Sequence, residues 1–145
     1  MTTPAKQKVT IPIKTLADGF QIPALGLGTW GMGGEYERDE KNDATDIKII
    51  KQAISLGMTN IDTAEKYAAG HAEELVGTAI KGADRKKLFI VSKVWEENLH
   101  YDDVMEAADK SLKRLGTDYI DLYLVHMRNF DIPLKETMKA MDLLK

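Results

Sequence analysis

The sequence predicts an α/β fold in which short parallel strands alternate with amphipathic helices. Short apolar segments recur roughly every 30 residues, which is the size of one βα unit in a parallel sheet. A stretch with hydrophobic residues at helical spacing follows each segment. The short segments are also apolar throughout, as strands are when both faces of a parallel sheet are buried.

The first ordered element should be a β-hairpin. Residues 1–8 are interpreted as a polar, flexible start, and the hairpin is expected over residues 9–23. Asp18-Gly19 lies between two apolar-rich segments, which is a strong hairpin signal. Pro12 has no amide hydrogen, so the first strand of this hairpin should be an edge strand or an irregular one.

Residues 24–145 should hold four βα units. The predicted strands are 25–28, 59–61, 88–92 and 119–125, and the predicted helices are 43–56, 72–80, 101–115 and 134–144. Gly57 and Gly116 follow two of these helices, where a left-handed residue commonly ends a helix. Two arrangements fit this pattern. One is a doubly wound sheet, and the other is half of an eight-unit barrel, which typically needs about 250 residues.

The composition is that of a globular domain and excludes several classes of protein. Hydrophobic residues make up 43% and charged residues 30%, with a net charge of −3 and no basic cluster, so no nucleic-acid partner is expected. The absence of cysteine excludes disulfides and thiol nucleophiles, and it suits a cytoplasmic localisation. There is no signal-peptide pattern and no apolar run of the roughly 20 residues that a membrane helix needs.

Four side chains with complementary chemistry follow predicted strands: Asp62, Tyr67, Lys93 and His126. The carboxyl ends of parallel strands share one face, and ligands bind there in open α/β sheets and in barrels. An ammonium beside a phenol favours the phenolate, so Lys93 would make Tyr67 a better proton donor, with Asp62 holding Lys93 in place. His126 could donate a hydrogen bond to a carbonyl oxygen. None of the four is a nucleophile, so a hydride from a nicotinamide is the expected attacking species.

Each of these residues alone has a purely structural interpretation, such as a turn cap or a loop aromatic, and their convergence on one face favours a site. Trp30 and Trp95 would be pocket walls or rim packing. The Gly-rich stretch Gly26–Gly34 does not match a pyrophosphate-binding pattern, because carboxylates follow it, and a flexible loop over the site is expected instead.

Two further groups of residues are interpreted as structural. His71 and His100 have no partner at metal-ligand spacing, so no metal site is predicted and both are expected to be surface or capping residues. Glu73 and Glu74 fall in the first turn of a predicted helix, where negative charge is favourable.

The segments 25–30, 60–67, 73–77, 91–95 and 111–126 resemble the aldo-keto reductase family. The resemblance implies a (β/α)8 TIM-type barrel closed at the bottom by the hairpin, with residues 1–145 as its N-terminal half. It implies an oxidoreductase that reduces aldehydes and ketones with NADPH or NADH, of which NADPH is favoured. Most of the dinucleotide grip in the family comes from strands five to eight, which are not among these residues.

The resemblance also assigns roles to single residues. Tyr67 is the expected proton donor and Lys93 the residue that activates it, with Asp62 as partner of Lys93 and His126 orienting the carbonyl. The expected cofactor-binding residues are Gly28, Thr29, Trp30 and Asp62, and the expected substrate-binding residues are Trp30, Trp95 and His126. The chain departs from the family pattern at Met127-Arg128, where Trp-Pro is common, and at Ala68-Ala69, where a Tyr-Gly-x-Gly-x-Ser pattern is more usual.

Two alternatives to a reductase stay open at this point. The chain as it stands could be a catalytically incompetent half barrel that associates with itself or needs a C-terminal partner. It could also be a non-enzymatic modulatory subunit, because some members of the family serve as channel subunits.

Overall fold

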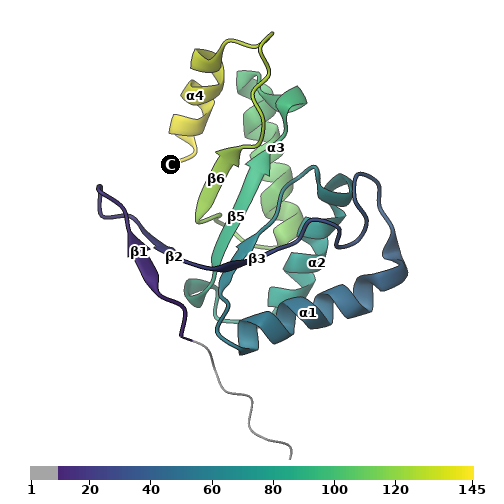
Figure 1. Ribbon diagram of the computed structural model, residues 1–145. Coiled ribbons are helices and arrows are strands. Elements are labelled where there is room, and N and C mark those ends of the chain that lie inside the picture. The colour runs from purple at the N-terminus through teal and green to yellow at the C-terminus, as the bar shows by residue number, and fades with distance from the viewer. Residues whose placement is uncertain (1–9) are drawn as a thin grey trace, which may run out of the picture.

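The computed structural model describes residues 10–145 (Figure 1). The predicted polar start and Val9 of the predicted hairpin lie outside the described residues. The first element is an antiparallel hairpin of β1 (Ile13–Thr15) and β2 (Gln21–Pro23). Asp18 stabilises the turn, because its carboxylate accepts the amide hydrogen of Phe20 at 2.9 Å. Gly19 supplies the left-handed residue at φ 88°.

A four-stranded parallel sheet follows in the order β3-β4-β5-β6. Its strands are β3 (Gly26–Gly28), β4 (Asn60–Asp62), β5 (Phe89–Val94) and β6 (Leu122–Val125). Strands that follow one another in the chain are neighbours in the sheet, and the order never reverses. This is the arrangement of a partial (β/α)8 barrel and not of a doubly wound sheet, so the predicted fold class is confirmed.

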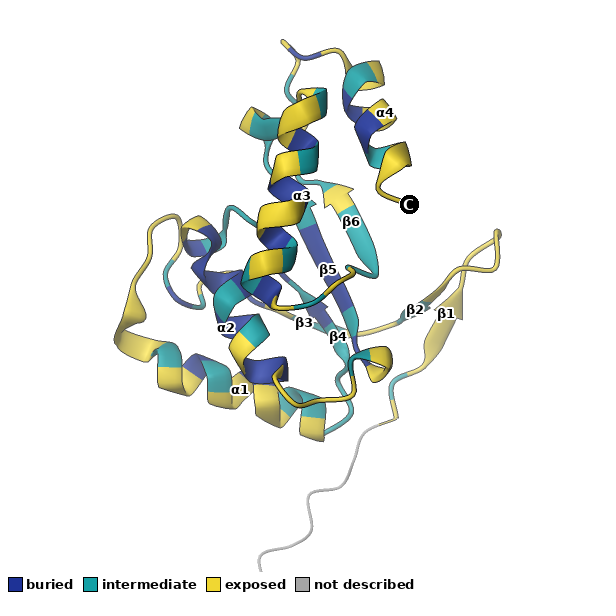
Figure 2. Ribbon diagram, turned by 180° about the vertical axis from the view of Figure 1, so that it is seen from behind, coloured by how far each residue is buried: buried dark blue, intermediate teal, exposed yellow. Residues whose placement is uncertain are grey.

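The long helices lie on one face of this sheet (Figures 1 and 2). They are α1 (Asp43–Ser55), α2 (His71–Ile80), α3 (Tyr101–Leu115) and α4 (Leu134–Leu143), and each agrees with its predicted range to within one residue at either end. Short 3-10 segments occupy Glu40–Asn42, Tyr67–Gly70, Arg85–Lys87 and Glu96–Asn98. Within residues 10–145, no helix has the length and apolar character needed to cross a membrane.

The core lies between the sheet and its helices. Ile61 of β4 and Ile90 of β5 are fully buried in a cluster with Val76 of α2 and Leu115 of α3. Burying one such side chain contributes about 1.5–3 kcal/mol, so these contacts hold the helices on the sheet. Side chains alternate along a strand, and Lys93, three residues beyond Ile90, therefore lies on the opposite, inner face of the sheet.

The hairpin lies against the amino ends of the strands. The ring of Phe20 packs edge-on to the ring of Phe89, the first residue of β5, with centroids 5.9 Å apart. The Asn60 side-chain amide also donates to the carbonyl oxygen of Pro23 at 3.4 Å. The hairpin thus lies at the end that the resemblance calls the bottom, with its strand β1 exposed, and the carboxyl ends of the strands stay clear of it.

The predicted ends of β5 and β6 are wrong, and both differences follow from pairing across the sheet. β5 continues to Val94 and does not stop at Ser92, because its last four residues pair with β6. Lys93 therefore lies inside the strand and not just past it. β6 begins only at Leu122, because the Asp121 carboxylate accepts the Ile90 amide hydrogen at 2.8 Å in place of a backbone carbonyl.

Candidate active site

Lys93 brings the predicted acid, phenol and amine into contact. Its Nζ donates to Asp62 Oδ1 at 2.5 Å, to the carbonyl oxygen of Thr63 at 2.9 Å and to the hydroxyl of Tyr67 at 3.3 Å. These three acceptors match the three hydrogens of the ammonium. The Lys93 side chain is 12% exposed and that of Asp62 is 43% exposed, so the charge is held just below the surface.

The backbone on both sides of the Asp62 carboxylate is held by neighbouring strands. The amide and the hydroxyl of buried Thr29 both donate to the carbonyl oxygen of Asp62, at 3.0 and 3.2 Å. The Thr63 amide donates to the carbonyl oxygen of Val91 at 2.9 Å. The carboxylate is therefore directed at Lys93 before any ligand arrives, which is the preorganisation that electrostatic catalysis requires.

Tyr67 begins a tight turn that leads into α2. Ala68 and Ala69 have φ values of 51° and 53°, in the left-handed region. This conformation costs an L-residue about 1–2 kcal/mol, so the surrounding structure has to stabilise it. Ala68 is fully buried, and its amide donates to the carbonyl oxygen of Glu35 at 2.6 Å. The loop after β3 thereby holds the turn that carries the phenol.

An aromatic row surrounds the phenol. It runs from Tyr36 through Trp30, Tyr67 and His126 to Trp95, with neighbouring ring centroids 5.0–5.5 Å apart in edge-on geometry. Such pairs contribute about 0.5–1.5 kcal/mol each beyond the area they bury. Trp30 remains 47% exposed, so the row offers an open apolar wall beside the Tyr67 hydroxyl.

Two residues that sequence reasoning did not single out hold Trp95 in this row. Glu65 Oε1 accepts the Trp95 amide hydrogen at 2.6 Å and the Asn98 side-chain amide at 3.0 Å. Lys66 Nζ lies 5.0 Å from the centroid of the Trp95 ring, within the range of a cation–π contact. Their place between Asp62 and Tyr67 was the only signal that pointed to them.

His126 is positioned to act as a neutral hydrogen-bond donor. Burial, followed by the positive charge of Lys93, lowers the pKa of His126, although the charges of Asp62 and Glu65 act in the other direction. Its Nδ1 is buried and has no hydrogen-bond partner among residues 10–145. A neutral imidazole carries one N–H, so at neutral pH the ring can donate to an oxygen and adds no charge to the site.

The structure thus gathers all the predicted site residues at one end of the sheet. Gly28, the last residue of β3, pairs in register with Asp62, and Thr29 and Trp30 follow it directly. A large hollow elsewhere, between α2 and α3, contacts none of them. The site is therefore the open face at the carboxyl ends of the strands.

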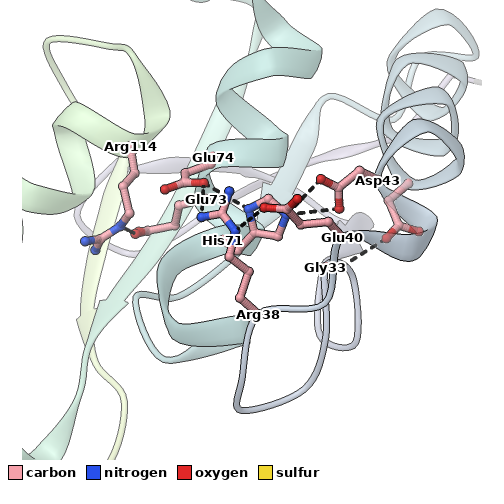
Figure 3. A network of polar contacts seen from close by, with 9 residues as sticks. Gly33, Arg38, Glu40, Asp43, His71, Glu73, Glu74 and Arg114 are labelled. Carbon is pink, nitrogen blue, oxygen red and sulfur yellow. Dashed lines mark hydrogen bonds and ion pairs between the residues drawn. The ribbon is translucent and has the colours of Figure 1, made fainter.

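The prediction that His71 is a surface or capping residue is wrong (Figure 3). His71 is 4% exposed, with Nε2 2.9 Å from Asp43 Oδ1 and Nδ1 2.9 Å from Glu74 Oε2. Arg38 Nη1 joins the same Glu74 oxygen at 2.8 Å. His71 therefore ties α1 and the loop after β3 to the first turn of α2. Glu73 lies in the first turn of α2 as predicted, and its side chain is fully buried.

We expect the free energy of unfolding to fall as the pH rises above about 6.5, the ordinary pKa of histidine. Burial alone would lower the pKa of His71, but the hydrogen bonds that its ring donates to Glu74 and Asp43 outweigh burial and the charge of Arg38, so the pKa is raised. A raised pKa stabilises the fold below the unfolded value, and this stabilisation is lost as the pH rises through the folded value.

Urea unfolding at a series of pH values measures this loss, with His71→Gln as the comparison. The variant should be about 1.5–3 kcal/mol less stable near pH 6, because it loses hydrogen bonds to charged groups. Its stability should also change less with pH. His100 and His126 are present in both proteins, so the difference between the two curves isolates His71. Parallel curves would contradict the assignment.

Comparison with known proteins agrees with this geometry. Residues 24–145 match the family described as "Aldo/keto reductase family". The chain is 44% identical over 121 residues to the methylglyoxal reductase YeaE of Escherichia coli, covering 83% of this chain and 40% of that protein. It is 40% identical over 129 residues to the glyoxal reductase of Bacillus subtilis, covering 88% of this chain and 42% of that protein.

Solved structures give the same result. A crystal structure of a thermostable aldo-keto reductase in complex with the inhibitor epalrestat superposes with a TM-score of 0.89 at 51% identity, covering 92% of this chain and 49% of that one. An aldo/keto reductase from Klebsiella pneumoniae in complex with NADP and acetate superposes with a TM-score of 0.78 at 41% identity, covering 97% and 46%. The chain therefore spans less than half the length of these relatives.

Proposed function

The chain belongs to the aldo/keto reductase family, and we propose that it carries the catalytic residues of an NADPH-dependent reductase of aldehydes and ketones. The observation that supports this most is the Lys93 ammonium, which is hydrogen-bonded to both Asp62 and Tyr67 where the strands end. Relatives named methylglyoxal reductase and glyoxal reductase, and related structures in complex with NADP or NADPH, support the substrate class and the cofactor.

In the proposed mechanism, Tyr67 donates its phenolic proton to the carbonyl oxygen of the substrate. Lys93 stabilises the phenolate that remains, and Asp62 keeps Lys93 charged and in place. Neutral His126 donates a hydrogen bond to the same oxygen and orients it. Bound NADPH supplies the hydride that the carbonyl carbon accepts, so hydride and proton together give the alcohol.

The residues at the end of β3 fit the nicotinamide end of such a cofactor. A Cβ added to Gly28 would meet no atom within 4 Å, so there is open space beside Asp62. We assign the nicotinamide contact to Gly28, Thr29, Trp30 and Asp62. The Gly33 amide is used within the loop, because it donates to Asp46 Oδ2 at 3.0 Å, so it would not hold a phosphate of the cofactor.

We propose that Trp30 and Trp95 form the pocket walls: Trp30 packs directly on the ring of Tyr67, and His126 lies between Tyr67 and Trp95. The aromatic row presents apolar edges around the phenol, which suits a small aldehyde or ketone whose only strong polar contacts are at its oxygen. Met127 and Arg128 follow His126 and are exposed, so they would border this wall on the outer side.

We further propose that residues 1–145 form the N-terminal half of a longer barrel. The share of each relative that the chain covers supports this, as do the four parallel strands and the exposed inner face, where Leu124 is 36% exposed. We call these residues together with the C-terminal half "the complete protein". The chain alone would then be a half barrel that lacks most of the grip on the cofactor.

The complete protein is expected to oxidise NADPH when methylglyoxal or glyoxal is added. The fall in NADPH absorbance measures this reaction. Residues 1–145 alone should show no turnover above background and weak NADPH binding in a fluorescence titration. A complete protein that binds NADPH and reduces no carbonyl would contradict the proposed reaction. An isolated chain that sediments as a monomer and turns over would contradict the half-barrel proposal.

A further inference from the structure

A buried carboxylate lies on the helix side of the proposed active site. Glu73, in the first turn of α2, is fully buried. Its Oε1 accepts the Ser92 hydroxyl at 2.5 Å, and its Oε2 accepts Arg114 Nε at 2.7 Å (Figure 3 shows Glu73 and Arg114). Arg114 Nη2 also donates to the Ser111 hydroxyl at 3.2 Å. We call these four residues the Glu73 cluster.

The cluster is a costly way to fill this space if it serves packing alone. Removing a carboxylate from water costs several kcal/mol, and apolar side chains of similar volume often replace a buried ion pair without loss of stability. The helix dipole offsets only about 0.3–1 kcal/mol of that cost. The Glu73 carboxylate instead contributes directional hydrogen bonds. Such bonds fix the relative position of the two groups that they connect more closely than apolar contacts do.

The parts joined by Glu73 are the two that carry the proposed proton donor and its activating cation. Glu73 lies six residues after Tyr67, just past the strained turn, and Ser92 immediately precedes Lys93 in β5. Side chains alternate across a strand, so Ser92 and Lys93 lie on opposite faces of β5. The bond from Glu73 to Ser92 therefore fixes, from the helix side, how β5 presents Lys93 on the inner side.

Arg114 holds the other end of the same unit. A Cβ added to Gly70 would lie 2.9 Å from Cδ and Nε of Arg114, so the last residue of the Tyr67 turn packs directly on this side chain. Gly70 has φ 91°, which glycine adopts without strain. One arginine thus contacts both the end of the turn and the Glu73 carboxylate.

We propose that Glu73 is a positioning residue for carbonyl reduction: by binding Ser92 and Arg114 it sets the separation of the Tyr67 hydroxyl and Lys93 Nζ. The proposal rests on the proposed function, because it concerns the same proton donor. Glu73 touches neither Tyr67 nor Lys93 and acts through the turn and the strand that carry them.

The test compares Ser92→Ala with Ser111→Ala in the complete protein, using NADPH and methylglyoxal. Both serines are fully buried, and each contributes one hydroxyl to the cluster, but only Ser92 is on β5. Ser92→Ala should lower kcat about tenfold with little change in KM, because a misplacement of about 1 Å can cost a hundredfold in rate. Both variants should lower the melting temperature by about the same amount, because each loses one buried hydroxyl. Ser111→Ala should nevertheless leave kcat within about twofold of that of the unchanged protein.

The possible outcomes separate the two levels of the proposal. Equal losses of kcat in both variants, or none in either, would overturn the positioning role of Glu73. Tyr67→Phe is assayed in parallel. If it keeps its activity, the proposed function itself fails. If it is inactive while Ser92→Ala is fully active, only the positioning role fails.

Discussion

Replacing Tyr67 with phenylalanine is expected to lower kcat for aldehyde reduction by about 10²–10⁴-fold in the complete protein, the range that a general acid contributes. The substitution removes one hydroxyl and leaves the ring against Trp30 and His126. The apolar wall therefore stays in place, and KM for the aldehyde should change little. A loss confined to kcat is typical of an interaction made in the transition state.

Tyr101→Phe is the control for this experiment. Tyr101 opens α3, and its ring centroid lies 5.3 Å from Lys139 Nζ of α4 and is not part of the aromatic row. The control should keep kcat within about twofold, in line with the small effects of surface substitutions. Circular dichroism checks that both variants fold. A Tyr67→Phe protein with most of its activity would remove Tyr67 from its proposed role.

Replacing Arg114 with methionine is expected to lower the free energy of unfolding by about 3–5 kcal/mol, the cost of leaving one member of a buried ion pair alone. Methionine keeps much of the volume and removes the cation. The Glu73 side chain is 0% exposed and would keep only Ser92 as a donor. Urea unfolding measures the loss as a lower midpoint.

Lys113→Met is the matched comparison, because Lys113 is the neighbour of Arg114 on the same helix. Its pair with Asp109 is at the surface, with side chains 73% and 60% exposed. Such pairs are worth about 0–1 kcal/mol, so this variant should unfold at nearly the original urea concentration. Equal losses in the two variants would mean that the Arg114–Glu73 pair is screened like a surface pair.

Local pattern was enough to predict the helices of this chain. Hydrophobic residues at helical spacing, with Gly57 and Gly116 just past two helix ends, located all four helices to within one residue. The order of the strands was not accessible from the residue pattern, because it depends on pairing between distant segments. That pairing also moved the end of β5 to Val94, and the Asp121 carboxylate delayed the start of β6.

The candidate site was predictable for a different reason. Asp62, Lys93 and His126 each come near the end of an apolar strand, and parallel pairing alone brings such positions together. His71 and Glu73 lacked any comparable signal. Their partners Asp43 and Arg114 are 28 and 41 residues away, and charged side chains in a first helical turn are usually solvated. Long-range ion pairs of this kind leave no local trace in a sequence.

The left-handed pair Ala68-Ala69 has a consequence for the timing of events at the site. The free-energy cost of this backbone conformation arises when the chain folds, and it does not arise again when a substrate binds. The phenol of Tyr67 is therefore already immobilised, and the entropy that a mobile side chain would lose on binding is already lost. A turn with glycine at both positions would adopt this backbone conformation without strain. It would also hold the phenol of Tyr67 less rigidly before a substrate binds.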